Sequence, residues 1–226
     1  MKIVSYNLAQ GTQWKLERVL DMEADLYVLP ECADERHVVL PQGYAMVWAG
    51  DDDLSTKGLG VVYKTSLKVG VVQEYTPIKH HLPLLVQGQE RAFFLLACWP
   101  TVRNERKTYP QLLLEALWTY GFYLSRYPSL AIGDFNCYVG QRGVSKRTGT
   151  FEDCIREMAE YGMRSVYHTL SGEPFGKESI ATFYWYFRES NPFFIDYAFT
   201  NIPVKHYSVG EWDKKMSDHC PQFIEL

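Results

Sequence analysis

The sequence lacks long apolar runs, flexible linkers and repeats. No apolar stretch approaches the roughly 18 to 20 residues that span a bilayer, so we expect a soluble protein without a membrane partner. No segment rich in proline, glycine or serine divides the chain, and there is no internal repeat or low-complexity tract. With 226 residues and 46% hydrophobic content, the chain can bury one sizeable core. We therefore predict one domain over residues 1–226.

Excess positive charge and paired cysteines are also missing. The 27 acidic and 23 basic residues give a formal net charge of −4, so a polyanion could be held only by local contacts. The five cysteines are odd in number and form no CxxC pair, and residues 1–7 leave no room for a signal peptide. These features favour a reducing, cytoplasmic location, and we expect a monomer.

Apolar periodicity predicts interleaved helices and strands. Helices are predicted over residues 14–20, 112–124 and 151–159, and strands over residues 2–6, 25–29, 44–49, 58–63, 67–75, 91–99, 130–134 and 223–226. Thr150 and Asp153 have the spacing of a capping box at the start of the third helix. His80 and His81 stand beside Pro83 and are expected in a surface connection. The pattern indicates a layered α and β protein.

The sequence does contain short acidic and amide-bearing segments in a fixed order along nearly its whole length. They are Ser5-Tyr6-Asn7, Leu29-Pro30-Glu31, Gly133-Asp134-Phe135-Asn136, Ile195-Asp196-Tyr197 and Ser217-Asp218-His219. Most of them close an apolar, β-rich run, so their carboxylates and amides would gather at strand ends, as in sites of oxygen ligands. A hard cation there polarises a phosphoryl oxygen and acidifies water. The ordered set therefore predicts metal-assisted cleavage of phosphate esters.

We assign Glu31 and Asp218 to a Mg²⁺ or Mn²⁺ ion, with Asn7 contributing its amide oxygen directly or through water. A lone glutamate after a strand is more often a solvated turn residue, but its place in the ordered set favours the metal. The acidic excess of the chain is compatible with a bound divalent cation, because crowded carboxylates repel one another without one.

Asp134 and Asn136 are predicted to handle the nucleophile. If their segment stays extended, residues two apart point to the same side, while Phe135 turns to the core. The carboxylate would orient or deprotonate a water, and the amide would donate to a phosphoryl oxygen or fix the carboxylate. The alternative is an Asx turn that merely caps the strand.

Asp218 and His219 are adjacent and would need a loop or strand end to act at one site, which Ser217 and Pro221 favour. Asp196 is the carboxylate expected to hold the imidazole, fixing its tautomer so that an N–H faces the charge that develops on phosphorus.

The ordered set resembles the endonuclease/exonuclease/phosphatase superfamily, the DNase I-like fold shared by AP endonucleases, DNase I and inositol phosphatases, over residues 2–224. The resemblance implies an α+β fold, a four-layer αββα sandwich of two packed mixed β-sheets flanked by helices, with the site at one edge. It also implies that Glu31 is the principal metal ligand, that Asp134 and Asn136 handle nucleophile and phosphate, and that Asp196 orients His219.

Two positions depart from the family pattern. Many members have a phosphate-touching His or Tyr at the end of the central strand, where this chain has Cys98 and Trp99. Many also have a His where this chain has Phe194. A missing proton-transfer group would lower the rate by roughly 10² to 10⁴. Tyr109 or His168 could substitute.

Further substrate contacts were assigned to four side chains, each with a structural alternative. They are Thr182, Trp99, Arg142 and His168. Thr182 could donate to phosphate or be an ordinary strand residue, Trp99 does not replace a family His or Tyr equally well, and Arg142 lies in a basic loop that could be simply solvated. The aromatic run over residues 184–187 could stack a base, although alternating aromatics are more often core.

These patterns favour a metal-dependent phosphodiesterase, and among these a nuclease acting on DNA or RNA. A phosphomonoesterase of a small or lipid-like phosphate is the alternative in the same chemistry, and it is favoured by the net charge of −4. A non-catalytic binding module on a degenerate scaffold is the alternative of another class, motivated by Cys98, Trp99 and Phe194.

Overall fold

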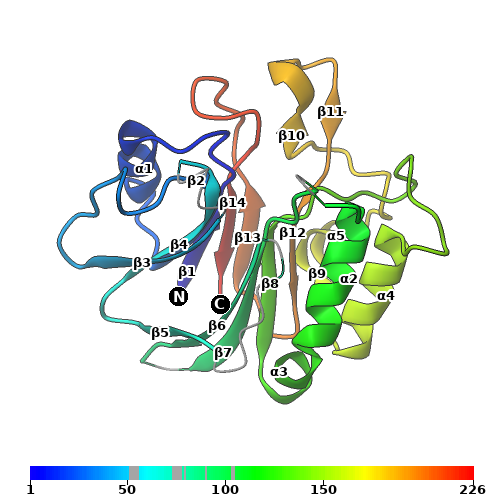
Figure 1. The fold of residues 1–226 in the computed structure, drawn as a ribbon, viewed down its shortest axis with the longest axis horizontal. Coiled ribbons are helices and arrows are strands. Elements are labelled where there is room, and N and C mark those ends of the chain that lie inside the picture. The colour runs from blue at the N-terminus through cyan, green and yellow to red at the C-terminus, as the bar shows by residue number, and fades with distance from the viewer. Residues whose placement is uncertain (51–55, 73–77, 79, 90, 103–104) are drawn as a thin grey trace.

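The computed structural model describes residues 1–226 except 51–55, 73–77, 79, 90 and 103–104. Two six-stranded sheets pack face to face, and helices cover their outer faces (Figure 1). The predicted four-layer sandwich of mixed sheets is confirmed. Among the described residues, no helix has the length and apolarity needed to cross a bilayer.

The first sheet has the strand order β13-β14-β1-β2-β4-β3. Its strands are β1 (Lys2–Ser5), β2 (Leu26–Cys32), β3 (Tyr44–Ala49), β4 (Gly58–Lys64), β13 (His206–Val209) and β14 (Gln222–Glu225). β1 and β2 are parallel, so both end at the same edge of the sheet, whereas the other neighbours are antiparallel. Helix α1 (Gln13–Leu20) packs Leu16 and Val19 against the outer face, which is formed by Val4, Tyr27 and Val62.

The second sheet has the order β5-β6-β7-β8-β12-β9. Its strands are β5 (Lys68–Val71), β6 (His81–Gln87), β7 (Ala92–Cys98), β8 (Ser129–Asp134), β9 (Arg164–Ser165) and β12 (Asp196–Thr200). The helices on its side are α2 (Tyr109–Thr119), α3 (Gly121–Arg126), α4 (Phe151–Glu160) and α5 (Val166–Ser171). A third, two-stranded unit, β10 (Phe183–Tyr184) and β11 (Pro192–Phe193), projects from the upper edge in Figure 1 and encloses the single turn η2 (Trp185–Phe187).

Alternation of side chains along the central strands divides the core into layers. In β7, Phe93 and Leu95 face the layer between the sheets, whereas Phe94 and Leu96 face the helices. A strand that is buried on both faces reads as a continuous apolar run, as the sequence of β7 does. The central strands are therefore fixed on both sides, and their ends are rigid supports for polar side chains.

Several local predictions need correction. His80 and His81 are buried rather than in a surface connection, and His81 opens strand β6. Pro83 is tolerated in that strand because the ladder with β5 begins only at Leu84. The predicted helix over residues 112–124 is two helices that meet at Tyr120. The capping box of Thr150 and Asp153 at α4 is present, and the end of the predicted 67–75 strand, from residue 73, lies outside the described residues.

Candidate active site

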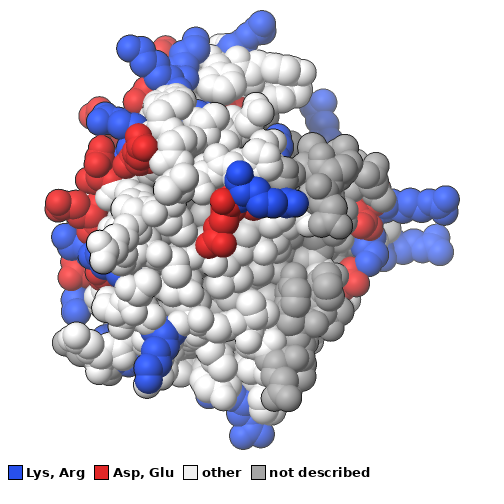
Figure 2. All heavy atoms as spheres, turned by 60° about the vertical axis from the view of Figure 1, so that its left-hand side comes forward, with Lys and Arg blue, Asp and Glu red and all other residues white. Residues whose placement is uncertain are grey.

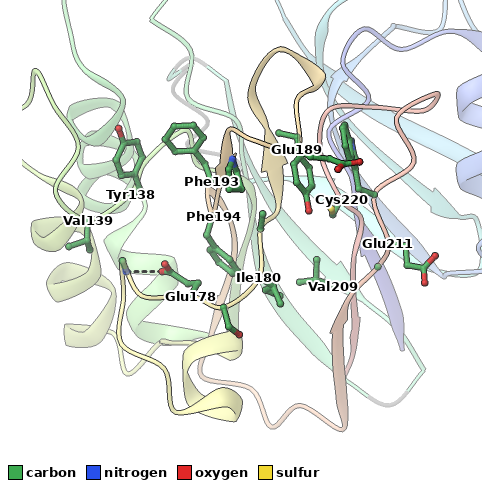
Figure 3. Close-up of a pocket in the computed structure, with 17 residues that line it drawn as sticks. Tyr138, Val139, Glu178, Ile180, Glu189, Phe193, Phe194, Val209, Glu211 and Cys220 are labelled. Atoms are coloured by element: carbon green, nitrogen blue, oxygen red, sulfur yellow. Dashed lines mark hydrogen bonds between the residues drawn. The ribbon is translucent and has the colours of Figure 1, made fainter.

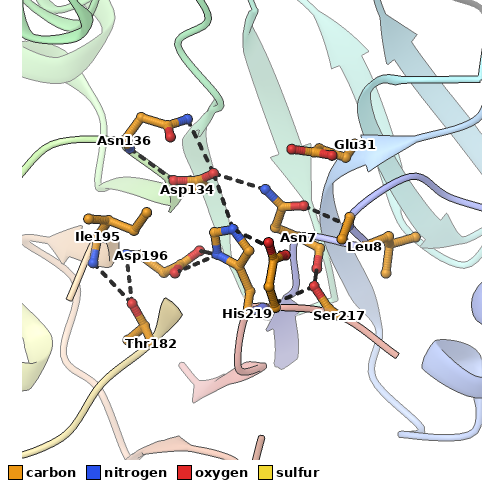
Figure 4. Close-up of polar contacts among 12 residues, drawn as sticks. Asn7, Leu8, Glu31, Asp134, Asn136, Thr182, Ile195, Asp196, Ser217 and His219 are labelled. Atoms are coloured by element: carbon orange, nitrogen blue, oxygen red, sulfur yellow. Dashed lines mark hydrogen bonds and ion pairs between the residues drawn. The ribbon is translucent and has the colours of Figure 1, made fainter. Parts of the chain in front are cut away.

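The strand ends that carry the predicted site residues lie at the upper edge of the sandwich in Figure 1, the edge from which the β10–β11 hairpin projects. The carboxyl ends of β1 and β2 lie there in one sheet, and the end of β8 with the start of β12 lie there in the other. The loop before β14 brings in His219. Figure 4 shows the resulting cluster, in which side chains from distant segments of the chain face one another.

The β8–β12 register places two carboxylates beside each other. Asp134 is the last residue of β8 and is the direct antiparallel partner of Asp196, the first residue of β12. The strand pairing therefore brings together two residues that lie far apart in the sequence. Both side chains are buried.

His219 lies between these carboxylates. Its Nδ1 is 2.9 Å from Oδ2 of Asp196, and its Nε2 is 3.8 Å from Oδ2 of Asp134. The backbone N–H of His219 donates to Oγ of Ser217, and this hydroxyl donates to the carbonyl of Asn7 at 2.6 Å. The predicted pairing of Asp196 with His219 is thus observed, and the imidazole is oriented by its neighbours on both sides.

Thr182 supports this arrangement from behind. Its Oγ1 accepts the backbone N–H groups of Ile195 and Asp196, each at 3.0 Å, and the residue is fully buried. Both bonds hold the chain where β12 begins. In this structure Thr182 positions the backbone of Asp196 rather than facing solvent.

Asp134 is surrounded by donors. Its Oδ2 accepts Nδ2 of Asn7 at 2.9 Å and Nδ2 of Asn136 at 3.2 Å, and its Oδ1 accepts the backbone N–H of Asn136. Asn136 has φ of 52°, so the segment is not extended as the spacing argument assumed. The Asx turn forms, and it is this turn that brings the amide of Asn136 back to the carboxylate.

The electrostatics of the pair Asp134 and His219 are strongly perturbed. Burial raises the pKa of Asp134 to about 7, although His219 and the donated hydrogen bonds act in the opposite direction. Burial alone would lower the pKa of His219, but the charges of Asp196 and Asp134 outweigh it and raise that pKa to about 9. The acidic neighbours of His219 thus favour the protonated imidazole, and burial favours the neutral carboxyl group of Asp134.

Glu31 and Asp218 occupy the more open side of the cluster. Glu31 has φ of 57° and lies in a bulge of β2, where the pairing with β4 shifts between Pro30 and Cys32. Such bulges redirect a side chain, and Figure 4 shows the Glu31 carboxylate turned toward Asp134 and Asn7. Burial raises the pKa of Asp218, with the negative charge of Glu31 among the further causes.

Among the described residues, two lysines that the sequence analysis did not identify lie on this open side. Nζ of Lys57 lies 2.8 Å from Oε2 of Glu31. Lys15 donates to the carbonyls of Leu8 at 2.5 Å and Ala9 at 3.3 Å. Burial lowers the pKa of Lys15, whereas the nearby charges of Asp218 and Glu31 act to raise it. No local motif marks either lysine, so only the folded arrangement identifies them.

Two groups of residues could hold a metal ion. Asp134, Asp196 and His219 each offer one ligand atom within 4.8 Å of the others, but these atoms already interact with one another in a buried setting. Glu31 and Asp218 are carboxylates on the open side, and the contact of Glu31 with an ammonium group marks a position that favours positive charge. Hard divalent ions prefer oxygen ligands and retain waters, so this second group fits Mg²⁺ or Mn²⁺ better.

Asn7 is engaged within the cluster. Its Nδ2 donates to Asp134, and its Oδ1 accepts the backbone N–H of Ala9 at 2.9 Å. The contact with Asp134 was not expected from the sequence. A metal contact of the amide oxygen stays a prediction.

Three of the predicted substrate contacts take no part in the interactions of this cluster. Trp99 is buried and stacks on His80 at 4.9 Å. Both ring nitrogens of His168 have partners, Ser165 and Glu178, and its ring stacks on Phe175. Arg142 is exposed in the loop after β8.

The positions that depart from the family pattern are also accounted for by packing. Cys98 and Phe194 belong to the apolar core under the helices. The three cysteines that follow site residues, Cys32, Cys137 and Cys220, are buried.

A groove of about 850 Å³ lies beside the cluster (Figure 3). None of the seven predicted catalytic and metal residues lines it, but Cys220, the neighbour of His219, does. Aromatic side chains form much of its wall, and the ring of Tyr184 stacks on that of Trp212 at 4.1 Å. Phe183 of the same hairpin packs on His219, with ring centroids 4.6 Å apart. The β10–β11 hairpin therefore lines the groove and also contacts the polar cluster at His219.

Comparison with known proteins gives matches among solved structures. No protein-family model and no curated protein sequence matches this chain. The endonuclease domain of TRAS1, a telomere-specific non-LTR retrotransposon, is 12% identical with a TM-score of 0.65 and covers 100% of this chain and 97% of its own. The AP endonuclease LMAP from Leishmania major is 13% identical with a TM-score of 0.65, covering 99% and 86%. TDP2 from D. rerio, in complex with a single-strand DNA product, is 15% identical with a TM-score of 0.60, covering 99% and 97%.

These similarities extend over nearly the whole of each chain, although the sequences have diverged widely. They agree with the architecture of two mixed sheets flanked by helices. The chain has the DNase I-like fold of the endonuclease/exonuclease/phosphatase proteins.

Proposed function

We propose that the protein is a divalent-metal-dependent phosphodiesterase that cleaves nucleic acid. The observation that carries this proposal is the geometry around His219, whose Nδ1 is held by Asp196 while Nε2 lies 3.8 Å from Asp134. A carboxylate and an imidazole whose pKa values are both raised thus face each other, an arrangement that favours a catalytic role.

Asp134 is the proposed base. Its raised pKa of about 7 makes it a better proton acceptor than an ordinary carboxylate. The amide groups of Asn7 and Asn136 hold it in one orientation. It would take the proton of a water that attacks phosphorus.

His219 is the proposed donor to the developing negative charge. Its raised pKa of about 9 keeps the imidazole protonated at neutral pH, and Asp196 fixes the ring so that Nε2–H points into the site. A fixed N–H of this kind stabilises the phosphoryl oxygens as their charge grows, without reorganisation during the reaction.

Glu31 and Asp218 are the proposed holders of Mg²⁺ or Mn²⁺. When bound, the ion would supply Lewis-acid polarisation of a phosphoryl oxygen and lower the pKa of water. The two carboxylates come from the first sheet and from the loop before β14, whereas Asp134 and Asp196 come from the second sheet. The substrate phosphate would therefore lie across the gap between the two sheet edges.

Nucleic acid is favoured as the substrate by the β10–β11 hairpin. Trp185 and Tyr186 lie at its tip, are 49% and 67% exposed, and stack on each other at 4.8 Å. Exposed aromatic rings beside a phosphate site provide stacking surfaces for bases. The DNA-bound TDP2 has the same fold, which adds support from a protein of known ligand.

A phosphomonoesterase of a small phosphate remains the second candidate, because the net charge is −4 and the face drawn in Figure 2 has no prominent basic surface among its described residues. On the face drawn in Figure 2, Lys and Arg stand mostly at the margins and are interspersed with Asp and Glu, without a continuous basic stripe across its described residues. A nuclease with this surface would depend on stacking and local contacts more than on long-range attraction.

Competition between substrates separates the two candidates. Purified protein with Mn²⁺ would be given a single-stranded DNA oligonucleotide and p-nitrophenyl phosphate, separately and together. We expect metal-dependent cleavage of the DNA and inhibition of any monoester hydrolysis by it. Monoester turnover that DNA does not inhibit would contradict the nuclease proposal and favour the phosphomonoesterase.

A further inference from the structure

The contact between Lys57 and Glu31 concerns the carboxylate that we assign to the metal. The two charged atoms lie 2.8 Å apart, and the Glu31 side chain is 19% exposed. An ammonium group and a divalent ion bound to the same carboxylate would repel each other. The ammonium group of Lys57 and a divalent ion would therefore compete for Glu31.

Lys57 is held beside Glu31 by its backbone. Lys57 precedes Gly58, the first residue of β4, which pairs with Cys32 on the far side of the β2 bulge. Trp48 covers this point, since its Nε1 donates to the carbonyl of Cys32, and a Cβ added at Gly58 would lie 2.2 Å from its ring. The backbone is thus held in place next to Glu31 and next to Lys57.

The bulge fixes Glu31 in the same way. Its left-handed backbone conformation is uncommon for a residue with a side chain, and its carbonyl accepts the N–H of Gly11 at 2.5 Å. The carboxylate therefore stays near Lys57 without a metal ion. Its negative charge also acts on the carboxyl group of Asp218, and a cation between the two would reduce their repulsion.

We propose that Lys57 is a built-in competitor for the metal: its ammonium compensates Glu31 in the metal-free protein and must leave that carboxylate when a divalent ion binds. This rests on the proposed function insofar as Glu31 is the metal ligand. Lys57 then sets the metal concentration at which the enzyme becomes loaded, so it tunes metal affinity rather than taking part in the chemistry.

The chain offers a matched control at the other end of the same strand pair. Lys64 closes β4 and pairs with Asp25 at 2.9 Å, and its side chain is 38% exposed against 41% for Lys57. Lys64→Met removes the same charge at the other end of β4, away from the proposed metal carboxylates. Lys57→Arg keeps the charge at the tested position.

The test is calorimetric titration of the folded full-length protein with Mn²⁺ alone, at low ionic strength. Partly exposed ion pairs are weak, so we expect Lys57→Met to bind Mn²⁺ about two- to fivefold more tightly than the unmodified protein. Lys64→Met should bind with unchanged affinity, and Lys57→Arg should stay close to the unmodified protein. Added salt should reduce the difference.

Thermal unfolding gives a second readout that does not depend on activity. In EDTA, Lys57→Met should melt below the unmodified protein because Glu31 is left uncompensated beside Asp218. Saturating Mn²⁺ should remove that difference, whereas any effect of Lys64→Met should persist in both conditions.

Two results would overturn the inference and are distinguishable. If the unmodified protein binds Mn²⁺ and Lys57→Met binds it equally or more weakly, Lys57 is no competitor, although the proposed function stands. If neither protein binds a divalent ion, both the inference and the metal-dependent function are wrong.

Discussion

The two halves of the proposed site are built differently. On the second sheet, Asp134, Asp196 and His219 are buried and joined by short contacts, and their positions follow from the β8–β12 register. On the first sheet, Glu31 lies partly open in a strained bulge and is paired with a lysine. The half proposed for acid–base chemistry is thus organised in advance, whereas the half proposed for the metal is partly open to solvent.

This difference agrees with separate proposed roles for the two halves, proton transfer on the second sheet and metal binding on the first. Preorganised groups in a dry environment act strongly on developing charge without rearrangement. An exchangeable ion needs ligands that solvent can reach, because it keeps several waters. Changes on the second sheet should therefore reduce turnover, and changes on the first should shift metal affinity.

Substitution of Asp134 on the second sheet should have the largest effect on turnover. It acts as a base only when ionised, above its pKa of about 7, and His219 donates only when protonated, below about 9. We expect kcat/KM to be bell-shaped between these values, with both limbs belonging to the coupled pair. Asp134→Asn should lower turnover by about 10² to 10⁴ and remove the acidic limb.

The control for that measurement is Asp153→Asn, which weakens the capping box of α4. It should lower the melting temperature without changing the pH profile of the remaining folded protein. An Asp134→Asn variant that keeps both turnover and the acidic limb would remove Asp134 from the role of base.

Glu31→Gln should act on the other half. Loss of a charged ligand should weaken Mn²⁺ binding by at least about tenfold, since even indirect partners of metal ligands contribute that much. Calorimetry would measure it, with Glu17→Gln on α1 as the control. Unchanged affinity for Glu31→Gln would exclude this carboxylate from the metal site. Glu31→Gln is expected to weaken Mn²⁺ binding and Lys57→Met to strengthen it, so the two variants together distinguish the metal ligand from its competitor.

The smallest expected effect concerns the aromatic tip, which belongs to neither half. Trp185→Ala should weaken binding of single-stranded DNA by about 1 kcal/mol, or roughly fivefold, because one exposed stacking surface is lost. Fluorescence anisotropy with a labelled oligonucleotide would measure it. Trp118→Ala on α2 removes a tryptophan that is 62% exposed at another place and should have no effect. Equal losses in both variants would show that the binding is non-specific.

The sequence located the candidate side chains better than it located their contacts. Asp134 and Asn136 could be found because polar residues follow a buried apolar strand, a pattern that is local in the sequence. Their hydrogen bonds depend on a left-handed residue, Asn136, which the spacing argument treated as extended. The pairing of Asp134 with Asp196 requires a strand register that no single segment encodes.

Other features escaped prediction for related reasons. Lys57 meets Glu31 only because β4 pairs with β2 across a bulge, and nothing local distinguishes it from other lysines. Pro83 obscured strand β6, since its acceptability depends on where the neighbouring strand β5 ends. His168 carried a candidate role from its residue type alone, but the fold engages both of its nitrogens.

The most direct test of the central claim is hydrolysis of bis(p-nitrophenyl) phosphate with Mn²⁺ or EDTA by the unmodified protein, His219→Ala and His168→Ala. His168 is the matched control because it is also a histidine paired with a carboxylate, Glu178. We expect turnover that requires Mn²⁺, survives His168→Ala per folded molecule and falls by about 10² to 10⁴ in His219→Ala. The proposal would be contradicted by turnover that persists in EDTA or by turnover that is undiminished in His219→Ala. The absence of turnover by the folded, Mn²⁺-bound unmodified protein would contradict it as well.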